Sequence, residues 1–473
     1  MAESTNRVVK QYDAIILGSG QAGNPLAAAL SAKGKRTAMI ERAAVGGTCV
    51  NYGCTPTKTL VASAQVAYMA RRASEYGIKV GNVSVDMSSV RERKRGMVKK
   101  WREGSEKRLQ QAELVDVIYG EGSFVGAQQV RVRLNDGGER TLTAGLIVID
   151  TGLTANLPPL EGLENVPYLD NASVMELGEV PDHLLVLGGG YIGLEFAQMF
   201  RRFGSQVTLV QSGKQLLTGE DSDIADEIAA ILREEGIEIL LEAKTESAAA
   251  VRKGVRLAVK VKGVSRELEG THLLVATGRR PNTEKLNLSA AAITTDEQGY
   301  IRVNDKLETS APGIYAVGDV NGGPAFTHVS YDDFRVLQTN LLEGGNRSVA
   351  GRLFPYCVFI DPQLGRIGLS ENEAKKKGIE VRVARLPMTS VARALETGQT
   401  HGFMKALVDP ETEEILGAAI LGTDGGEVMS MIQVAMMGKL KYTALQSAIF
   451  AHPLFAEALN NLFSTLQGER QNG

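Results

Sequence analysis

Two cysteines stand close together near the start of the chain, in a position suited to redox chemistry. Cys49 and Cys54 are separated by four residues, and Thr55 and Pro56 follow as a predicted helix N-cap and first helical residue. The predicted helix continues to about Ala73. The positive end of its dipole would favour the thiolate form of Cys54. Position and spacing therefore predict a redox-active dithiol.

A zinc half-site is the alternative interpretation of the two thiols. Structural zinc takes four ligands, and the remaining cysteine, Cys357, lies far along the chain in an apolar stretch where a small core residue is expected. Met429, Ile432 and Met436 follow helical spacing, which predicts packing rather than soft-metal binding. We therefore expect no metal site.

His452 is a candidate acid and base. It precedes Pro453, which opens a helix-like stretch to Phe463, and Glu457 would lie one turn inside that helix. A carboxylate bonded to an imidazole fixes its tautomer and raises its basicity. The alternative is a histidine without a chemical role.

The elements that must position these groups include one unit that occurs twice. The first unit runs through an apolar strand, a glycine turn, a helix and a second strand: 12–17, Gly18-Ser19-Gly20-Gln21-Ala22-Gly23, 24–32 and 37–40. The second runs through 184–187, Gly188-Gly189-Gly190-Tyr191-Ile192-Gly193, a helix through Phe203, and 207–210. Each is predicted to be a βαβ unit.

The two glycine turns predict two dinucleotide sites. Glycines let backbone N–H groups approach a pyrophosphate at the positive end of a helix. Glu41 lies 23 residues after Gly18, and Gln211 lies 23 residues after Gly188. Two ordinary glycine-rich turns would have to acquire this matched spacing by accident. A flavin and a nicotinamide are the expected pair, since one holds electrons that the other delivers.

Gln211 bears on the choice of nicotinamide cofactor. A glutamate there would repel the 2′-phosphate of NADP, whereas Gln211, with Ser212 and Lys214 after it, offers donors and a cation. We predict that NADPH is accepted and preferred. The alternative is that the Gln211 amide still binds NADH.

Composition excludes several classes of protein. The chain has 473 residues, enough for about three domains. Its 52 basic and 55 acidic residues give a net charge of −3, so neither nucleic acid nor an acidic membrane is an expected partner. Three cysteines, a start without an apolar signal region and the lack of a long apolar run predict a soluble cytoplasmic protein.

The combined pattern resembles the flavin-dependent pyridine nucleotide-disulfide oxidoreductases, the family of dihydrolipoamide dehydrogenase, glutathione reductase and mercuric reductase. The resemblance rests on the two dinucleotide units and on Gly-Gly-Thr-Cys49-x4-Cys54-x-Pro-x-Lys58, and it covers nearly the whole chain. It continues in Thr151-Gly152, Thr277-Gly278, Tyr315-Ala-Val-Gly-Asp319 and His452-Pro-Leu-Phe-Ala-Glu457.

The family resemblance implies a fold and a set of site residues. It implies an α/β fold with two Rossmann-like dinucleotide-binding domains and a C-terminal α+β dimerisation domain. The FAD-binding domain would comprise 1–155 and 279–349, the NAD(P)-binding domain 156–278, and the dimerisation domain 350–473. Implied catalytic residues are Cys49, Cys54, Lys58, Glu195, His452 and Glu457. Implied cofactor-binding residues are Gly18, Gly20, Gly23, Glu41, Thr48, Lys58, Gly122, Thr151, Gly152, Gly188, Gly190, Tyr191, Gly193, Gln211, Gly278 and Asp319.

By the same resemblance, Lys58 lies near flavin N5 and pairs with Glu195, and Asp319 binds the ribityl chain. NADPH reduces FAD, electrons reach the Cys49–Cys54 disulfide, and Cys49 attacks an acceptor. The His452–Glu457 pair completes the active site of the partner subunit in an obligate homodimer.

Departures from the family pattern indicate which branch of the family the chain is most similar to. Leu454 replaces a frequent threonine, and Asp361-Pro362-Gln363 replaces a frequent Thr-Pro-Glu turn. The chain is thus more similar to the mercuric-reductase-like branch that includes reactive-chlorine-resistance reductases, but its tail has no second cysteine pair for mercury transfer. We expect a disulfide or a soft-metal ion as acceptor. Alternatives are a metal-ion reductase, a diaphorase or oxidase, and a redox sensor without turnover.

Overall fold

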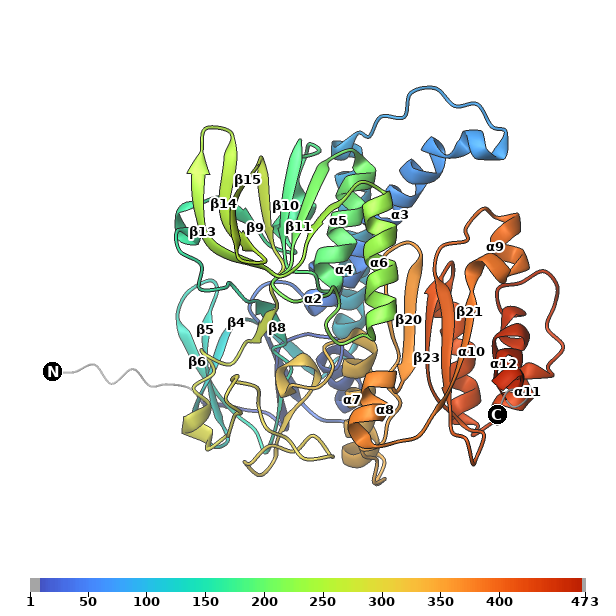
Figure 1. Cartoon of the computed structure of the whole chain (residues 1–473). Helices are drawn as coiled ribbons and strands as arrows, with labels where there is room; N and C mark the ends of the chain where they lie inside the picture. The colour runs from blue at the N-terminus through green and yellow to red at the C-terminus, as the bar shows by residue number, and fades with distance from the viewer. Residues whose placement is uncertain (1–8, 470–473) are drawn as a thin grey trace. The chain divides into compact units, whose positions relative to one another are not determined.

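The computed structural model describes residues 9–469 and divides into two compact units (Figure 1). Unit 1 comprises 1–59, 89–156 and 278–352, and unit 2 comprises 60–88, 157–277 and 353–473. Within the described residues, no helix is long and apolar enough to cross a membrane.

Unit 1 is built on an eight-stranded sheet in the order β1-β6-β5-β4-β3-β2-β7-β18. Its strands are β1 (Val9–Gln11), β2 (Ala14–Leu17), β3 (Thr37–Glu41), β4 (Val115–Gly126), β5 (Gln129–Leu134), β6 (Glu139–Thr143), β7 (Leu146–Ile149) and β18 (Ile314–Ala316). β2 and β3 are buried along their whole length, as expected for central parallel strands covered on both faces. The central strands thus hold the first glycine turn at their carboxyl ends.

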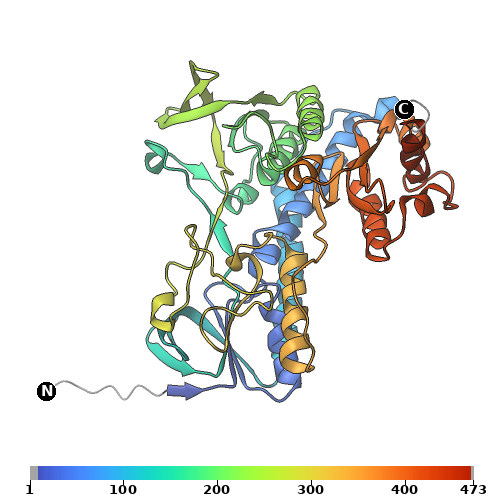
Figure 2. The ribbon, with the colours of Figure 1, turned by 60° about the horizontal axis from the view of Figure 1, so that its bottom comes forward.

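Helices and short elements complete unit 1. They are α1 (Gly23–Ala32), α2 (Gly47–Asn51), the start of α3 (Cys54–Arg71), most of α4 (Met87–Gln111), α7 (Thr327–Leu342), η4 (Leu288–Ala291), η5 (Gly318–Asn321) and the hairpin β8 (Leu153–Ala155) with β17 (Arg279–Pro281). α1 packs against α7, and α7 is the orange helix in Figure 2. Leu26, Leu30 and Leu337 contribute to the apolar core on this face of the sheet.

The middle of unit 2 contains a parallel sheet in the order β12-β11-β10-β16-β9. Its strands are β9 (Tyr168–Leu169), β10 (His183–Leu187), β11 (Gln206–Val210), β12 (Glu238–Leu240) and β16 (His272–Val275). α5 (Tyr191–Phe203) and α6 (Ser222–Glu234) pack on it, and β13 (Ala243–Val251), β14 (Gly254–Val261) and β15 (Val264–Gly270) form an antiparallel sheet. Short 3-10 turns lie at η1 (Ala73–Tyr76), η2 (Leu163–Asn165) and η3 (Ser173–Glu176).

The C-terminal part of unit 2 is an antiparallel sheet with helices packed on it. The order is β19-β20-β23-β22-β21, from β19 (Tyr356–Val358), β20 (Gln363–Gly368), β21 (Arg382–Pro387), β22 (Phe403–Val408) and β23 (Ile415–Gly422). Its helices are α8 (Glu371–Lys377), η6 (Met388–Ser390), α9 (Ala392–Glu396), α10 (Gly425–Met437), α11 (Tyr442–Gln446) and α12 (Ala458–Glu469). Met429 and Ile432 enter the core as predicted, and Met436 packs against it.

Three local predictions need correction. α3 begins at Cys54 itself, so Thr55 and Pro56 lie inside its first turn. α12 begins at Ala458, so Glu457 precedes the helix instead of lying one turn inside it. Phe455 and Leu459 are both buried in the same apolar core, and the chain turns between them, so the helix starts only after Glu457. Cys357 lies in a strand as predicted but is only half-buried.

Candidate functional site

The first glycine turn forms a cradle at the carboxyl ends of β2 and β3. Gly18 has a φ of +100°, and a Cβ there would collide with the carbonyl oxygen of Asp150, so only glycine fits. The buried Glu41 carboxylate accepts hydrogen bonds from the Ser19 N–H at 3.1 Å and the Ser19 hydroxyl at 2.6 Å. Turn and strand end are therefore held as one rigid loop.

Buried polar groups beside this cradle leave hydrogen-bonding positions for a ligand. Asp150 accepts a hydrogen bond from the Gly23 N–H at 2.7 Å, and burial raises the pKa of its carboxyl to about 8. The side-chain oxygens of Asn24 and Thr151 are buried without a hydrogen-bond partner among the described residues. Such atoms suit a ligand that would bond to them. Asp150 was not predicted from the sequence, although it is an acidic residue at a strand end directly before Thr151.

Asp319 lies close to Asp150 of the same cradle, and its charge adds to the rise in the Asp150 pKa. It lies in η5, and its carboxylate accepts a hydrogen bond from Arg279 at 3.1 Å. Burial raises the pKa of Asp319, while Arg279 opposes that rise. Arg279 directly follows the predicted Thr277-Gly278 pair but was not singled out from the sequence.

The two cysteines come together at the start of α3. Cys49 lies in α2 and is half-buried, and Cys54 is exposed, with its sulfur 3.4 Å from the Thr327 hydroxyl at the start of α7. The hydrogen bond to Cys54, together with burial, raises the pKa of the Cys49 thiol. The raised pKa favours the protonated form of Cys49, and the N-terminus of α3 would favour a thiolate at Cys54.

The second glycine turn repeats the geometry of the first. Gly188 has a φ of +109°, and a Cβ there would collide with the Ala276 carbonyl oxygen. The Gln211 Oε1 atom accepts a hydrogen bond from the Gly189 N–H at 3.0 Å. A dinucleotide pyrophosphate fits this turn for the same reason as the first.

α5 carries two further predicted residues. Tyr191 is its first residue and is half-buried. Glu195 is buried, and its carboxylate accepts a hydrogen bond from the Phe359 N–H at 2.9 Å. Lys58 belongs to unit 1 and Glu195 to unit 2, so their pairing stays a prediction.

His452 and Glu457 form the predicted pair. The Nδ1 atom of His452 lies 2.9 Å from a Glu457 carboxylate oxygen. The histidine side chain is 66% exposed, so its other nitrogen is open to solvent. The contact forms although Glu457 lies before α12, in the turn at 455–457.

The structure groups the other predicted residues by unit. Unit 1 also holds Gly20, Gly23, Thr48, Gly122, Gly152 and Gly278, and unit 2 also holds Gly190 and Gly193. Their roles toward cofactors stay predictions. Unit 1 thus contains one glycine cradle and the dithiol, and unit 2 contains the other cradle and the histidine–carboxylate pair.

Comparisons with known proteins cover nearly the whole chain. The family model for pyridine nucleotide-disulphide oxidoreductases matches residues 12–333, and the model for the dimerisation domain of that family matches residues 354–463. The probable pyridine nucleotide-disulfide oxidoreductase RclA of Escherichia coli K12 is 38% identical over 97% of this chain and 100% of its own. A mercuric reductase of Staphylococcus aureus is 33% identical over 95% of this chain and 81% of its own. A solved Cu(II) complex of the HOCl-induced flavoprotein disulfide reductase RclA from Escherichia coli matches with a TM-score of 0.89 at 37% identity, over 97% of this chain and 100% of that one.

Proposed function

The chain belongs to the pyridine nucleotide-disulphide oxidoreductase family, and we propose that it uses Cys49 and Cys54 to reduce a disulfide substrate. The predicted family and α/β fold are confirmed. The protein is a flavin-dependent oxidoreductase that binds FAD and NAD(P)H. The acceptor, the nucleotide preference and the roles of single residues are our proposals.

We assign the two cradles by their order in the chain. Segments 1–155 and 279–349, with Glu41 and Asp319, would hold FAD, and segment 156–278, with Tyr191 and Gln211, would hold the pyridine nucleotide. Together the two bound cofactors supply the electrons that reduce a disulfide to a dithiol. The Gln211 amide and the Lys214 cation support NADPH as the preferred nucleotide, because neither repels a 2′-phosphate.

The proximity of the two sulfurs is the observation that carries the proposed reaction. The Cys49 sulfur attacks one sulfur of the substrate disulfide, forms a mixed disulfide and releases the first substrate thiol. The Cys54 thiolate then attacks the Cys49 sulfur, which closes the Cys49–Cys54 disulfide and releases the second thiol. Two electrons have moved to the substrate. One of the two protons comes from Cys49, and the second thiolate that is released takes its proton from solvent.

The raised pKa of Cys49 creates a need for a base. The His452 imidazole, oriented by Glu457 at 2.9 Å, would take the Cys49 proton and return it to the leaving thiolate. By analogy with the family, we propose that this pair serves the dithiol of the other copy in a homodimer.

The match to a dimerisation domain supports a homodimer. The exposed face of α10 is apolar at Met431, Val434 and Met437, which are 40%, 68% and 68% exposed, and nearby in the sequence Ile449 is fully exposed. A dimer in which a second copy covers these residues would be stabilised by the burial of their apolar surface. We place the dimer in the cytoplasm, where a dithiol is kept in a reducing environment.

Anaerobic NADPH consumption tests the acceptor. The purified yellow protein is assayed with low-molecular-weight disulfides and, in parallel, with thiol-complexed Hg(II) or Cu(II), for the wild type and for His452→Ala. Turnover of a disulfide that falls at least 100-fold in the variant supports the proposal. Disulfide turnover that His452→Ala leaves unchanged would contradict it.

A soft-metal ion is the second candidate acceptor. Relatives include proteins named mercuric reductase and a Cu(II) complex of RclA, and the exposed Cys54 sulfur is accessible to a soft metal. Metal-dependent NADPH consumption that is indifferent to His452, with no disulfide turnover, would select this candidate.

A further inference from the structure

The loop between β11 and α6, residues 211–221, is packed on the second glycine turn. It starts at Gln211, whose Oε1 atom accepts the Gly189 N–H, and farther along the Leu217 N–H donates to the Gly189 carbonyl oxygen at 2.9 Å. The buried Leu216 side chain packs so close that a Cβ on Gly189 would lie 2.8 Å from its Cδ2 atom. A displacement of this loop would therefore move the glycine turn with it.

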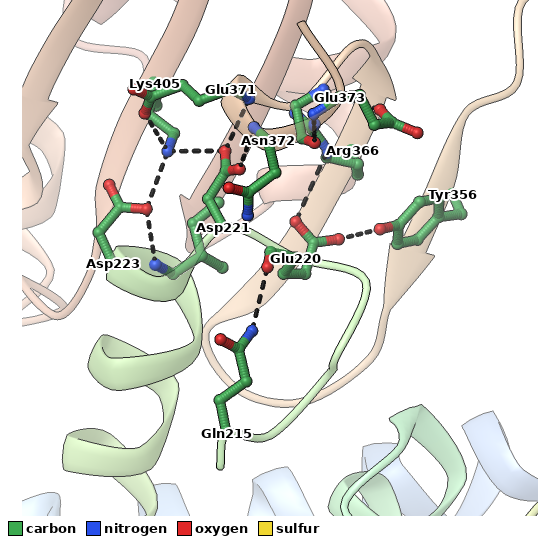
Figure 3. Close-up of polar contacts among 12 residues, drawn as sticks. Gln215, Glu220, Asp221, Asp223, Tyr356, Arg366, Glu371, Asn372, Glu373 and Lys405 are labelled. Carbon is green, nitrogen blue, oxygen red and sulfur yellow. Dashed lines mark hydrogen bonds and ion pairs between the residues drawn. The ribbon is translucent and has the colours of Figure 1, made fainter. Parts of the chain in front are cut away.

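The far end of loop 211–221 is attached to the part of unit 2 that matches the dimerisation domain. Glu220 is 3% exposed, and its carboxylate accepts a hydrogen bond from the Tyr356 hydroxyl of β19 (Figure 3). The other carboxylate oxygen faces the Nε atom of Arg366 on β20 at 3.6 Å. Gln215 links back within the loop by donating to the Glu220 carbonyl oxygen at 3.0 Å.

The next residue makes a second attachment. The Asp221 carboxylate accepts backbone N–H groups of Glu371 and Asn372 at the start of α8, at 3.1 and 3.0 Å. It also accepts from Lys405 at 2.9 Å, as Figure 3 shows. Lys405 is 1% exposed and donates as well to Asp223 and Glu371, at 2.8 and 2.7 Å. The single Lys405 ammonium thus binds three carboxylates at once, and we assign this cluster an anchoring role.

The Arg366 contact makes the first attachment sensitive to small changes. Arg366 is 3% exposed, and its two terminal nitrogens have no hydrogen-bond partner within residues 9–469. Its ion-pair partner in that part of the chain is Glu220. A buried charge that loses its partner is costly, so the loop end would rearrange if Glu220 or its hydroxyl donor were altered.

We propose that Glu220, held by Tyr356 and Arg366, is a positioning residue that fixes loop 211–221 on the second glycine turn and thereby sets affinity and selectivity for the pyridine nucleotide. This inference rests on the proposed assignment of Gln211 and Lys214 to that nucleotide. It means that the region matching the dimerisation domain helps to shape the nucleotide site.

The test measures binding without turnover. Dissociation constants for NADP⁺ and NAD⁺ are determined by calorimetry on the oxidised, FAD-loaded enzyme, for the wild type, Tyr356→Phe, Gln215→Ala and Glu220→Gln. Loss of one hydrogen bond in the anchor should raise Kd for NADP⁺ about fivefold. The limiting rate of flavin reduction at saturating NADPH should stay within twofold, because the reacting groups are untouched.

Matched controls separate positioning from stability. Tyr442→Phe alters another buried tyrosine of the same unit, and Glu235→Gln removes a partner of the buried Arg202, 2.7 Å away. Both should leave the Kd values unchanged even if the melting temperature falls. Gln215→Ala alters a half-buried loop side chain, so it keeps the test available if Glu220→Gln fails to fold.

Each outcome has a distinct meaning. Kd values within twofold of wild type in Tyr356→Phe and Gln215→Ala would overturn the proposal and leave the cluster a purely structural one. A wild type that binds NAD⁺ more tightly refutes the proposed NADPH preference, while a fivefold rise in Kd for NAD⁺ in the variants would still support positioning. A wild type that binds both nucleotides but reduces no disulfide refutes the proposed acceptor alone.

Discussion

Gln211 accepts a hydrogen bond from the Gly189 N–H at 3.0 Å, and Glu41 accepts the equivalent bond from the Ser19 N–H at 3.1 Å. The two dinucleotide units thus share one backbone contact, but the accepting side chain is a carboxylate in the first and an amide in the second. Glu41 is a carboxylate, which only accepts, whereas the Gln211 amide also donates to the Gln215 carbonyl oxygen at 3.3 Å. The second unit therefore has an amide where the first has the carboxylate that we propose as its ribose ligand.

Gln211→Glu should shift nucleotide preference toward NADH. The new carboxylate would repel a 2′-phosphate and accept from ribose hydroxyls, so the ratio of kcat/KM for NADPH to that for NADH should fall at least tenfold. Gln206→Glu adds the same charge at the exposed start of β11 and should leave the ratio unchanged. An unaltered ratio in Gln211→Glu would remove Gln211 from the selectivity determinants.

Cys49→Ser should separate the two halves of the reaction. Acceptor reduction should be lost, since serine cannot form the mixed disulfide, while stopped-flow absorbance should still show reduction of the flavin by NADPH. Cys357→Ser, which alters the half-buried cysteine of β19, should retain turnover. Full turnover in Cys49→Ser would refute the dithiol mechanism.

His452→Asn should slow disulfide reduction by about 100-fold to 10,000-fold, the range for loss of a general acid–base catalyst. Glu457→Gln should have a smaller effect, because the imidazole remains. His401→Asn is the matched control, since His401 is another partly exposed histidine, 3.8 Å from the Glu234 carboxylate. Equal losses in His401→Asn and His452→Asn would indicate a general effect on folding.

Glu220 should make stability fall as pH rises toward neutrality. Burial raises the pKa of its carboxyl to about 7 from an ordinary 4.5. The folded chain then keeps a proton that the unfolded chain has released, so the stabilisation from Glu220 is complete below about pH 4.5 and is lost as pH rises to about 7. A shift of this size corresponds to about 3 kcal/mol.

Urea unfolding of the FAD-loaded wild type and Glu220→Gln at pH 5 and pH 8 measures this contribution. The loss of apparent unfolding free energy between the two pH values should be smaller in the variant, by up to about 3 kcal/mol. The comparison cancels the contribution of Asp150, whose pKa is raised in both proteins. Identical pH dependence would show that the Glu220 carboxyl titrates normally.

Short-range patterns predicted the two βαβ units well. The sequence predicted strands over 184–187 and 207–210, and the structure has β10 and β11 there with one extra residue at each start. A glycine turn, a helix and two strands lie within about thirty residues, so their periodicity and spacing are visible in one stretch of sequence.

The anchors of the site could not be predicted, because they join distant segments. Glu220 and Tyr356 are 136 residues apart, and Asp221 and Lys405 are 184 apart. No local pattern marks which buried carboxylate meets which buried cation. Thr327, which lies beside Cys54, is 273 residues from it and gave no signal either.

Asp221 has a consequence for local unfolding. It is the N-cap residue of α6, yet its side chain makes no hydrogen bond to that helix and instead binds the first two N–H groups of α8. The Asp221 side chain thus couples the local unfolding of the N-terminus of α6 to that of the N-terminus of α8. Amide hydrogen exchange at Glu371 and Asn372 should accelerate whenever the first turn of α6 opens, so the two segments should exchange as one cooperative unit.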